Sequence, residues 1–173
     1  MSTEIAREAL SVWDDIATFW DESYSKDGNQ YFKLLQVPSL ERLLGEKLAG
    51  ATAGKIRALD LATGNGVVAR LLARHGAEVL ATDGSDNMLR IAADYVEGGM
   101  NMKFRRLDVT SDEEFERFVE EEASGFDIIT INMSIMDIAT LDPLARALPK
   151  LLTKDGMYVV SLTTHDAVLR TLL

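Results

Sequence analysis

A glycine-containing segment follows the first strongly apolar run of the sequence and is the first candidate for chemistry. The run at residues 56–61 leads into residues 60–66 (DLATGNG), and helical spacing of apolar residues begins directly afterwards. Gly64 and Gly66 allow a tight turn and a close approach of the backbone to a ligand, which the first free amides of the next helix can bind. An ordinary turn from strand to helix uses the same residues, so the pattern predicts a ligand site only in combination with others.

The same segment satisfies the dinucleotide-binding pattern G-x-G-x-x-G/A, with Ala69 in the last position. NAD would place an anionic pyrophosphate over this loop, and the Asp60 carboxylate would oppose that charge. A cofactor with a cationic sulfonium and ammonium but no phosphate would tolerate or favour the carboxylate. Asp60 therefore favours a cationic cofactor over NAD.

Two further carboxylates follow the next two strand-like runs. Asp83 could accept hydrogen bonds from both hydroxyls of a ribose, or it could stabilise the N-terminus of the helix that begins near Ser85. Asp108 could accept a hydrogen bond from an adenine amino group, with the Val109 amide donating to the ring. Because Asp is common after strands, Asp108 alone does not distinguish an adenine-binding site from an ordinary strand end.

Candidates for a general base follow the last two strand-like runs. Asp137 and His165 could each take a proton from a hydroxyl or ammonium nucleophile, and each could instead cap the segment after it. The chain has two His and no Cys, so it offers no convincing metal cluster, and we expect no metal.

Strand-like runs that alternate with helical spacing place these residues at one edge of a sheet. The runs lie at residues 56–61, 78–82, 102–107, 126–131 and 157–162. Such alternation predicts an α/β fold with a Rossmann-like doubly wound parallel sheet, because right-handed crossovers cover both of its faces. Ligands of such sheets bind beyond the carboxyl ends of the strands, where the candidate residues fall.

Local signals predict where several helices begin and end. One helix spans residues 85–96, and the sequence SDEE at 111–114 is a capping box that opens another. A further helix starts at Asp142-Pro143, and we expect it to end at Gly156. Residues 166–172 resemble the opening of one more helix.

The residues before the sheet predict a separate helical segment. Apolar residues from Ile5 to Trp20 fall at helical spacing, and the polar stretch 21–30 interrupts them as a hinge or lid. A second helix is entered through Pro38 and ends near Gly50. We divide one compact domain into an N-terminal helical lid segment at residues 1–50 and a Rossmann-like cofactor-binding core at residues 51–173.

Charge and composition exclude several classes of partner. The 173 residues include 28 acids and 18 bases, for a net charge of −10, which argues against nucleic acid and anionic membrane surfaces. No apolar run reaches the roughly 18 residues of a membrane span, and the N-terminus does not resemble a secretory signal. We therefore expect a soluble, cytoplasmic protein with a neutral or cationic small-molecule substrate.

From about Trp13 to His165, the chain resembles class I S-adenosylmethionine-dependent methyltransferases of the small-molecule type. The resemblance is carried by residues 59–89 (LDLATGNGVVARLLARHGAEVLATDGSDNML), 104–109 (FRRLDV), 126–138 (FDIITINMSIMDI) and 144–162 (LARALPKLLTKDGMYVVSL). It implies a strand order of 3-2-1-4-5, S-adenosylmethionine as cofactor and S-adenosylhomocysteine as product.

The resemblance also implies roles for individual residues. The methionine end of the cofactor would be held by Asp60 and the loop residues Ala62, Thr63, Gly64, Asn65 and Gly66. The ribose would be bound by Asp83 beside Gly84, and the adenine by Met88, Asp108 and Val109. Main-chain contacts near the amino group and the reacting methyl would come from Asn132 and Met133. Trp13 and Trp20 would belong to the lid or to the plain core, and Ala62 stands where many members have a glycine.

Members of this family usually have seven strands, the last two forming an antiparallel pair after the fifth helix. From the order of the strand-like runs we expect strands six and seven to be absent, which would leave residues 157–164 (MYVVSLTT) as an apolar edge. We expect a second copy in a homodimer, or another chain, to cover that edge.

These observations predict methyl transfer to a small molecule by in-line displacement. The alternative is a catalytically inactive or truncated methyltransferase-like protein that binds the cofactor or a protein partner. An NAD(P)-dependent oxidoreductase is disfavoured by Asp60.

Overall fold

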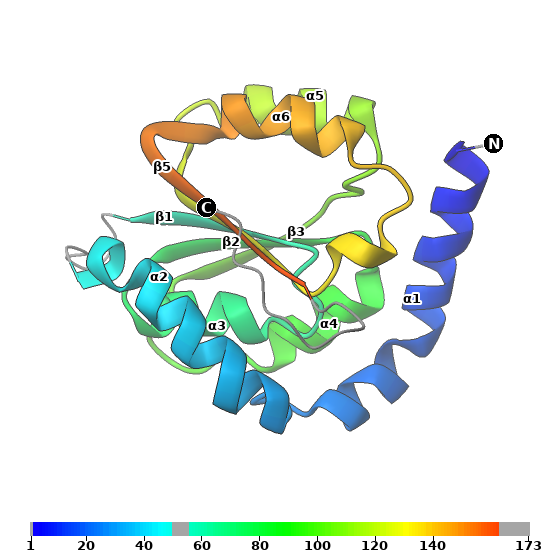
Figure 1. Cartoon of the computed structure of the whole chain (residues 1–173). Helices are drawn as coiled ribbons and strands as arrows, with labels where there is room; N and C mark the ends of the chain where they lie inside the picture. Colours follow the sequence, from blue (N-terminus) through cyan, green and yellow to red (C-terminus); the bar gives the residue numbers. More distant parts are fainter. Residues whose placement is uncertain (1, 50–55, 163–173) are drawn as a thin grey trace.

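A five-stranded parallel sheet forms the centre of the described part of the molecule (Figure 1). The structure is a computed structural model that describes residues 2–49 and 56–162. The strands are β1 (Arg57–Leu61), β2 (Glu78–Asp83), β3 (Met102–Arg106), β4 (Phe126–Asn132) and β5 (Leu152–Ser161). They lie in the order β3-β2-β1-β4-β5 and pair in parallel, which confirms the predicted α/β fold and the order 3-2-1-4-5.

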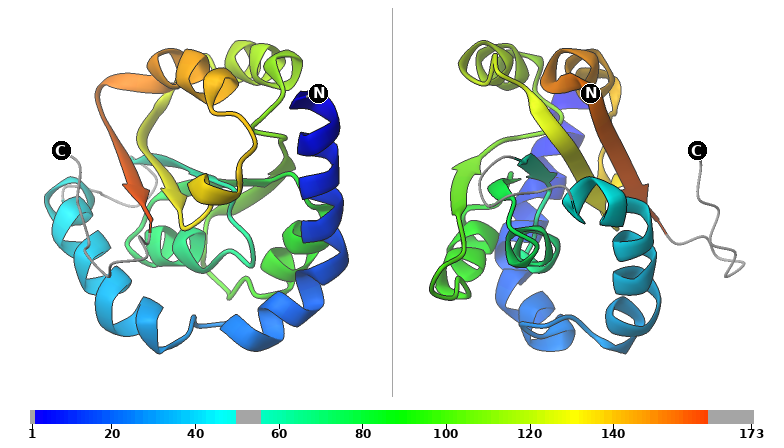
Figure 2. Two further views of the ribbon diagram at one scale, coloured as in Figure 1. Left: turned by 45° about the vertical axis from the view of Figure 1, so that its right-hand side comes forward. Right: turned by 90° about the vertical axis from the view of Figure 1, so that its left-hand side faces the viewer.

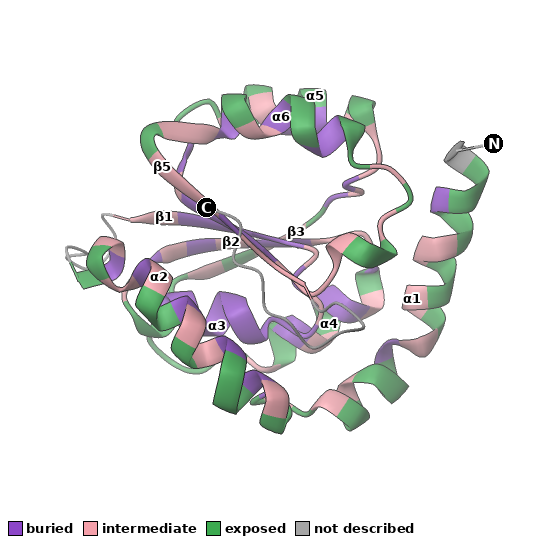
Figure 3. Ribbon diagram, in the orientation of Figure 1, coloured by how far each residue is buried: buried purple, intermediate pink, exposed green. Residues whose placement is uncertain are grey.

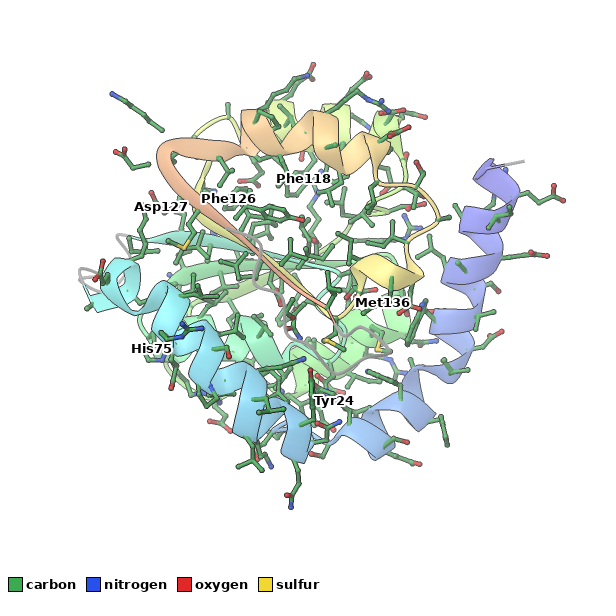
Figure 4. The ribbon with its side chains drawn as sticks, in the orientation of Figure 1. Tyr24, His75, Phe118, Phe126, Asp127 and Met136 are labelled. Atoms are coloured by element: carbon green, nitrogen blue, oxygen red, sulfur yellow. The ribbon has the colours of Figure 1, made fainter. Side chains whose placement is uncertain are left out.

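Helices cover both faces of this sheet, and each side has its own apolar core. α3 (Val67–Arg74) and α4 (Asp86–Asp94) lie on one face, and α5 (Asp112–Glu121) and α6 (Asp142–Leu151) on the other (Figure 1 and Figure 2). The buried residues form two clusters, which Figure 3 shows along the strands and the inner sides of the helices. In the second cluster Phe118 stacks on Phe126, with ring centroids 6.4 Å apart (Figure 4). Burial on both faces explains why the strands are continuously apolar.

The N-terminal residues form a helical arm around the core. The arm consists of α1 (Ser2–Tyr24), a short π-helix η1 (Phe32–Gln36) and α2 (Val37–Ala49). α2 packs through Leu40, Leu44 and Leu48 against the cluster that α3 also joins. α1 stands apart from the sheet and contacts α4 (Figure 1). The predicted division at residue 50 stays a prediction.

The fully buried residues of α1 are small. Ala6 and Ala17 are buried, whereas Ile5, Val12 and Phe19 have 53%, 55% and 70% of their surface exposed. The helical spacing of the sequence is therefore confirmed, but these three large side chains do not join the core. Small residues at the contact let the helix approach the rest of the molecule closely.

Two details of the predicted helix signals are wrong. α6 ends at Leu151, and Gly156 lies inside β5 instead of ending the helix. The pairing of β4 and β5 shifts register near this point, and a Cβ atom on Gly156 would lie 2.9 Å from the Phe126 carbonyl oxygen. Ser111 caps α5 as predicted, but Glu114 accepts from the Asp108 amide at 2.8 Å instead of completing the capping box.

Three other predictions concern the last helix, the exposed edge of the sheet and the crossing of a membrane. The helix predicted at residues 166–172 lies outside the described residues. β5 is an edge strand within the described sheet, and its covering by another chain stays a prediction. Across residues 2–49 and 56–162, no helix combines the length and the hydropathy that crossing a bilayer requires.

Candidate functional site

A cavity of about 250 Å³ lies between α1 and the carboxyl ends of the strands. Most of the predicted site residues line it together, although they come from four separate strand ends. They are Ala62, Thr63, Gly64, Asn65, Asp83, Gly84, Met88, Asp108, Val109, Asn132 and Met133. Asp60 and Gly66 are the predicted residues that do not line it. The parallel strand order explains this convergence, because it brings the carboxyl ends of neighbouring strands to one edge.

The loop after β1 is held in left-handed backbone conformations. Gly64 and Gly66 have φ angles of +55° and +78°, and a Cβ atom on Gly66 would lie 3.0 Å from the Ala92 Cβ atom. Ala62 also has a positive φ, +48°. The alanine that replaces the usual glycine therefore costs about 1 kcal/mol through its backbone conformation.

Asp83 joins this loop to the start of α4. Its carboxylate accepts from the Gly64 amide at 2.8 Å and from the Ser85 amide at 2.9 Å. Burial raises its pKa above the ordinary value, although both amides oppose that shift. The bond from Ser85 matches the predicted role at the helix N-terminus, and the same side chain also lines the cavity. The two roles considered for Asp83 are thus compatible.

Asp60 lies beneath the loop, and its carboxylate does not line the cavity. It is 1% exposed and accepts from the hydroxyls of Thr63 and Thr130, both at 2.6 Å. Burial raises its pKa to about 6, and the two hydroxyls only partly offset that shift. Its place beneath the loop is that of a positioning residue, and a direct contact between Asp60 and a ligand stays a prediction.

The end of β3 presents one carboxylate and one free amide. Oδ1 of Asp108 accepts from the Thr110 amide at 2.8 Å and from its hydroxyl at 2.6 Å. In the part of the chain that the structure describes, the Val109 amide has no hydrogen-bond acceptor. Met88 is 2% exposed beneath the same region. This arrangement can pair with a ring that has a donor beside an acceptor.

The N-terminal arm closes the cavity with aromatic side chains. Trp13, Trp20 and Tyr24 line it. The ring centroids of Trp13 and Trp20 are 5.5 Å apart, and those of Trp20 and Tyr24 are also 5.5 Å apart. The predicted lid role of the two tryptophans is thus compatible with their placement. The sequence did not predict Tyr24, Tyr31 and Gln36, which also line the cavity. The available signal was the presence of Tyr24 within the polar stretch 21–30 and of Tyr31 directly after it.

Two sets of hydrogen bonds tie the arm to the site. Near the loop, the Asn65 side chain donates to Asp21 at 2.9 Å, and the Tyr95 hydroxyl donates to the same carboxylate at 2.5 Å. The buried Arg70 guanidinium donates to the Asn65 carbonyl at 2.5 Å and to the Lys26 carbonyl. The position of the arm is therefore coupled to the conformation of the loop.

The second set joins Asp14 of α1 to the N-terminus of α4. Its Oδ1 atom accepts from the Ser85 hydroxyl at 2.6 Å and from the Asn87 amide at 3.0 Å. Free amides at a helix N-terminus favour a carboxylate, and the Ser85 hydroxyl, followed by the Asn87 amide, lowers the pKa of Asp14. The stabilisation from the Asp14 hydrogen bonds is fully present at pH values above the ordinary carboxyl pKa. It is lost as pH falls through the lowered pKa of Asp14.

We expect Asp14→Ala to loosen α1 while leaving the sheet folded. Both tryptophans of the chain lie on α1, so intrinsic fluorescence reports on the arm. The emission maximum should move to longer wavelength in the variant, and wild-type protein should show the same shift on acidification. The matched control is Asp15→Ala at an exposed neighbouring position. Equal spectra for wild type and Asp14→Ala would show that this contact does not hold the arm.

The structure describes one of the two candidate bases, Asp137. Asp137 lines the cavity near its rim, and partial desolvation raises its pKa. His165 lies outside the described residues.

Within the described ranges, no group of three or more His, Asp or Glu side chains could hold a metal ion.

Comparison with known proteins finds a matching family and several relatives. The methyltransferase domain family matches residues 58–156. A ubiquinone biosynthesis O-methyltransferase of Acinetobacter baylyi is 32% identical over 130 residues, which cover 73% of this chain and 48% of the relative. The chain thus spans about half the length of the curated relatives it matches.

Solved structures share the fold. A protein from Pyrococcus horikoshii OT3 has a TM-score of 0.63 at 24% identity, covering 83% of this chain and 60% of its own. A DhpI–SAH complex has a TM-score of 0.61 at 20% identity, covering 100% of this chain and 76% of its own. Together with the matched domain, these findings confirm the resemblance that the motifs indicated. The chain belongs to the methyltransferase domain family, in the class I group with a Rossmann-like fold.

Proposed function

We propose that this chain binds S-adenosylmethionine and transfers its methyl group to a small molecule. The observation that carries the proposal is the placement of Asp83, whose carboxylate lines the cavity while it accepts from the Gly64 amide. A half-buried carboxylate beside a glycine loop suits two ribose hydroxyls, which would donate to its remaining lone pairs. Family membership and the complex of DhpI with SAH support the same ligand.

The charges of the cavity fit this cofactor better than a dinucleotide. Asp83, Asp108 and Asp137 line it, and among the described lining residues none is Lys, Arg or His. A pyrophosphate would find three carboxylates and no cation, and the Gly64 amide that it would use already donates to Asp83. A sulfonium and an ammonium group would find compensating charge.

Each part of the cavity has a task in this proposal. The loop after β1, with Asn132 and Met133, would hold the methionine end, Asp83 the ribose hydroxyls, and Asp108 with the Val109 amide the adenine edge. When bound, S-adenosylmethionine supplies a methyl group on a cationic sulfur. The aromatic arm would exclude water and align the nucleophile opposite the sulfur, which is what an in-line displacement needs. Asp137 at the rim is the candidate base for a nucleophile that carries a proton.

Calorimetric titration tests the binding half of the proposal. We expect S-adenosylhomocysteine to bind at one site, whereas NAD should give no binding heat under the same conditions. The reverse preference would reject a methyltransferase and favour the oxidoreductase. Turnover with S-adenosylmethionine and candidate acceptors tests the second half, and tight binding with no transfer to any acceptor would favour the inactive alternative.

A further inference from the structure

A chain of polar side chains joins the ends of β4 and β5 to the arm, and the proposed cofactor contacts use only the main chain of its member Asn132. The Ser161 hydroxyl donates to Oδ1 of Asn132, and Nδ2 of Asn132 donates to Oε1 of Gln36 at 3.2 Å. Gln36 belongs to η1 of the N-terminal arm. The chain therefore connects the edge strand, its neighbour and the arm.

The direction of these hydrogen bonds fixes what Gln36 offers to the cavity. Its carbonyl oxygen faces Asn132, so its NH₂ group, which carries two donors, lies at the free end. Gln36 is 3% exposed and lines the cavity. The described residues include no fully buried polar side-chain atom that lacks a partner. The remaining accessibility of this amide is therefore toward the cavity, where it can donate to a ligand.

The position of Gln36 points to the methyl acceptor instead of the cofactor. The proposed cofactor contacts use the ends of β1, β2 and β3 and the main chain after β4. Gln36 is held by the Asn132 side chain at the end of β4, which Ser161 of β5 holds in turn, on the other side of the cavity from β3. A ligand atom that Gln36 touches would lie beside Asn132 and Met133, where the reacting methyl is proposed to stand.

The surroundings favour an uncharged aromatic acceptor. Tyr24 and Tyr31 of the same arm line the cavity. One face of Tyr24 stacks on Trp20, and a wall of this aromatic character suits an aromatic compound. An anionic acceptor would find no cation among the described lining residues. A cationic ammonium group carries only donors and could not pair with the Gln36 NH₂ group, although the carboxylates of the cavity would attract it elsewhere.

We infer that Gln36 determines specificity for the methyl acceptor: its side-chain amide donates to an oxygen atom of an uncharged aromatic compound. Asn132 and Ser161 are positioning residues that keep the NH₂ group turned toward the cavity. This inference rests on the proposed function, because it assumes that the rest of the cavity holds the cofactor.

Three probes of one shape test the inference on protein saturated with S-adenosylhomocysteine. They are 4-hydroxyacetophenone, which is uncharged, 4-hydroxybenzoate, which is anionic, and tyramine, which is cationic. Quenching of tryptophan fluorescence would measure their binding. We expect the uncharged probe to bind about ten-fold more tightly than either charged one, as the loss of one hydrogen bond or an unfavourable charge predicts. Preferred binding of tyramine or 4-hydroxybenzoate would overturn the assignment of acceptor class.

Two variants separate hydrogen bonding by Gln36 from its packing. Gln36→Glu keeps the size and the acceptor for Asn132 but removes the donors, and Gln36→Leu removes both. Each should weaken binding of 4-hydroxyacetophenone about ten-fold while changing the Kd of S-adenosylhomocysteine less than about two-fold. Unchanged probe binding in Gln36→Glu would show that the residue only packs. A parallel loss of S-adenosylhomocysteine binding would place Gln36 in the cofactor site.

A spectroscopic readout completes the test. In the wild type, the side-chain amide resonances of Gln36 should shift when 4-hydroxyacetophenone is added, and Ser161→Ala should reduce that shift together with the affinity. A resonance that does not move would contradict a direct hydrogen bond. Failure of the proposed function looks different: wild-type protein would then bind no S-adenosylhomocysteine, or would bind it and transfer no methyl group to any acceptor.

Discussion

Replacing Asp83 with alanine should weaken the binding of S-adenosylhomocysteine at least about 100-fold. Two ribose hydroxyls donating to this carboxylate contribute roughly 1.5 kcal/mol each, and about 3 kcal/mol corresponds to that change in Kd. The variant also loses the acceptor for the Gly64 amide, so the loop after β1 would no longer be fixed in its binding conformation. Isothermal titration calorimetry measures the effect directly.

Controls separate ligand contact from general damage. Asp86→Ala makes the same chemical change at an exposed position of α4 and should leave the Kd within about two-fold. Asp83→Asn keeps one acceptor oxygen and the side-chain volume, so it should fall between alanine and the wild type. If Asp83→Ala bound S-adenosylhomocysteine as the wild type does, Asp83 would serve only the helix N-terminus.

The sequence predicted the fold and the strand-end part of the cavity wall because both depend on local signals. Each strand is a short apolar run, and each polar residue at its carboxyl end is brought to the same edge by parallel order. Asp83 and Asp108 could therefore be placed before the strand pairing was known. The shift inside β5 could not, since Gly156 acts through its approach to the Phe126 carbonyl, a contact between distant parts of the sequence.

Asp60 shows what position at a strand end leaves undecided. Side chains alternate between the faces of a strand, and Leu59 and Leu61 belong to the cluster on the α5 and α6 side. Asp60 consequently points to the opposite side, where Thr63 and Thr130 hold it beneath the loop. A carboxylate at the correct edge can thus face the interior instead of the ligand.

The arm was harder to place for a different reason. Tyr24, Tyr31 and Gln36 reach the cavity because the chain turns back between α1 and η1, and that turn is stabilised by contacts with Asn65 and Arg70. Such tertiary contacts leave little trace in local spacing. The sequence indicated a hinge or lid, but it did not indicate which of its side chains face inward.

Asp60→Asn should make the ligand-free protein more stable at neutral pH, by about 3 kcal/mol. Burial raises the pKa of this carboxyl from 3.8 to about 6, and roughly two pKa units correspond to that free energy. The unfolded chain ionises first, so the folded state binds more protons between about pH 4 and pH 6, and stability falls as pH rises through this window. An uncharged amide avoids the loss. Thr130 can accommodate it because its hydroxyl also reaches the Leu59 carbonyl at 3.4 Å.

Urea denaturation at several pH values provides the measurement. The difference in unfolding free energy between Asp60→Asn and wild type should be near zero at pH 4 and should reach its full value above pH 6. Asp14, whose pKa is lowered, contributes the opposite slope but is present in both proteins and cancels in the difference. Asp15→Asn, a control at an exposed position in the middle of α1, should change stability by less than about 0.5 kcal/mol at every pH. A difference that does not depend on pH would mean that Asp60 is not a buried charge, and its role beneath the loop would then be hydrogen bonding alone.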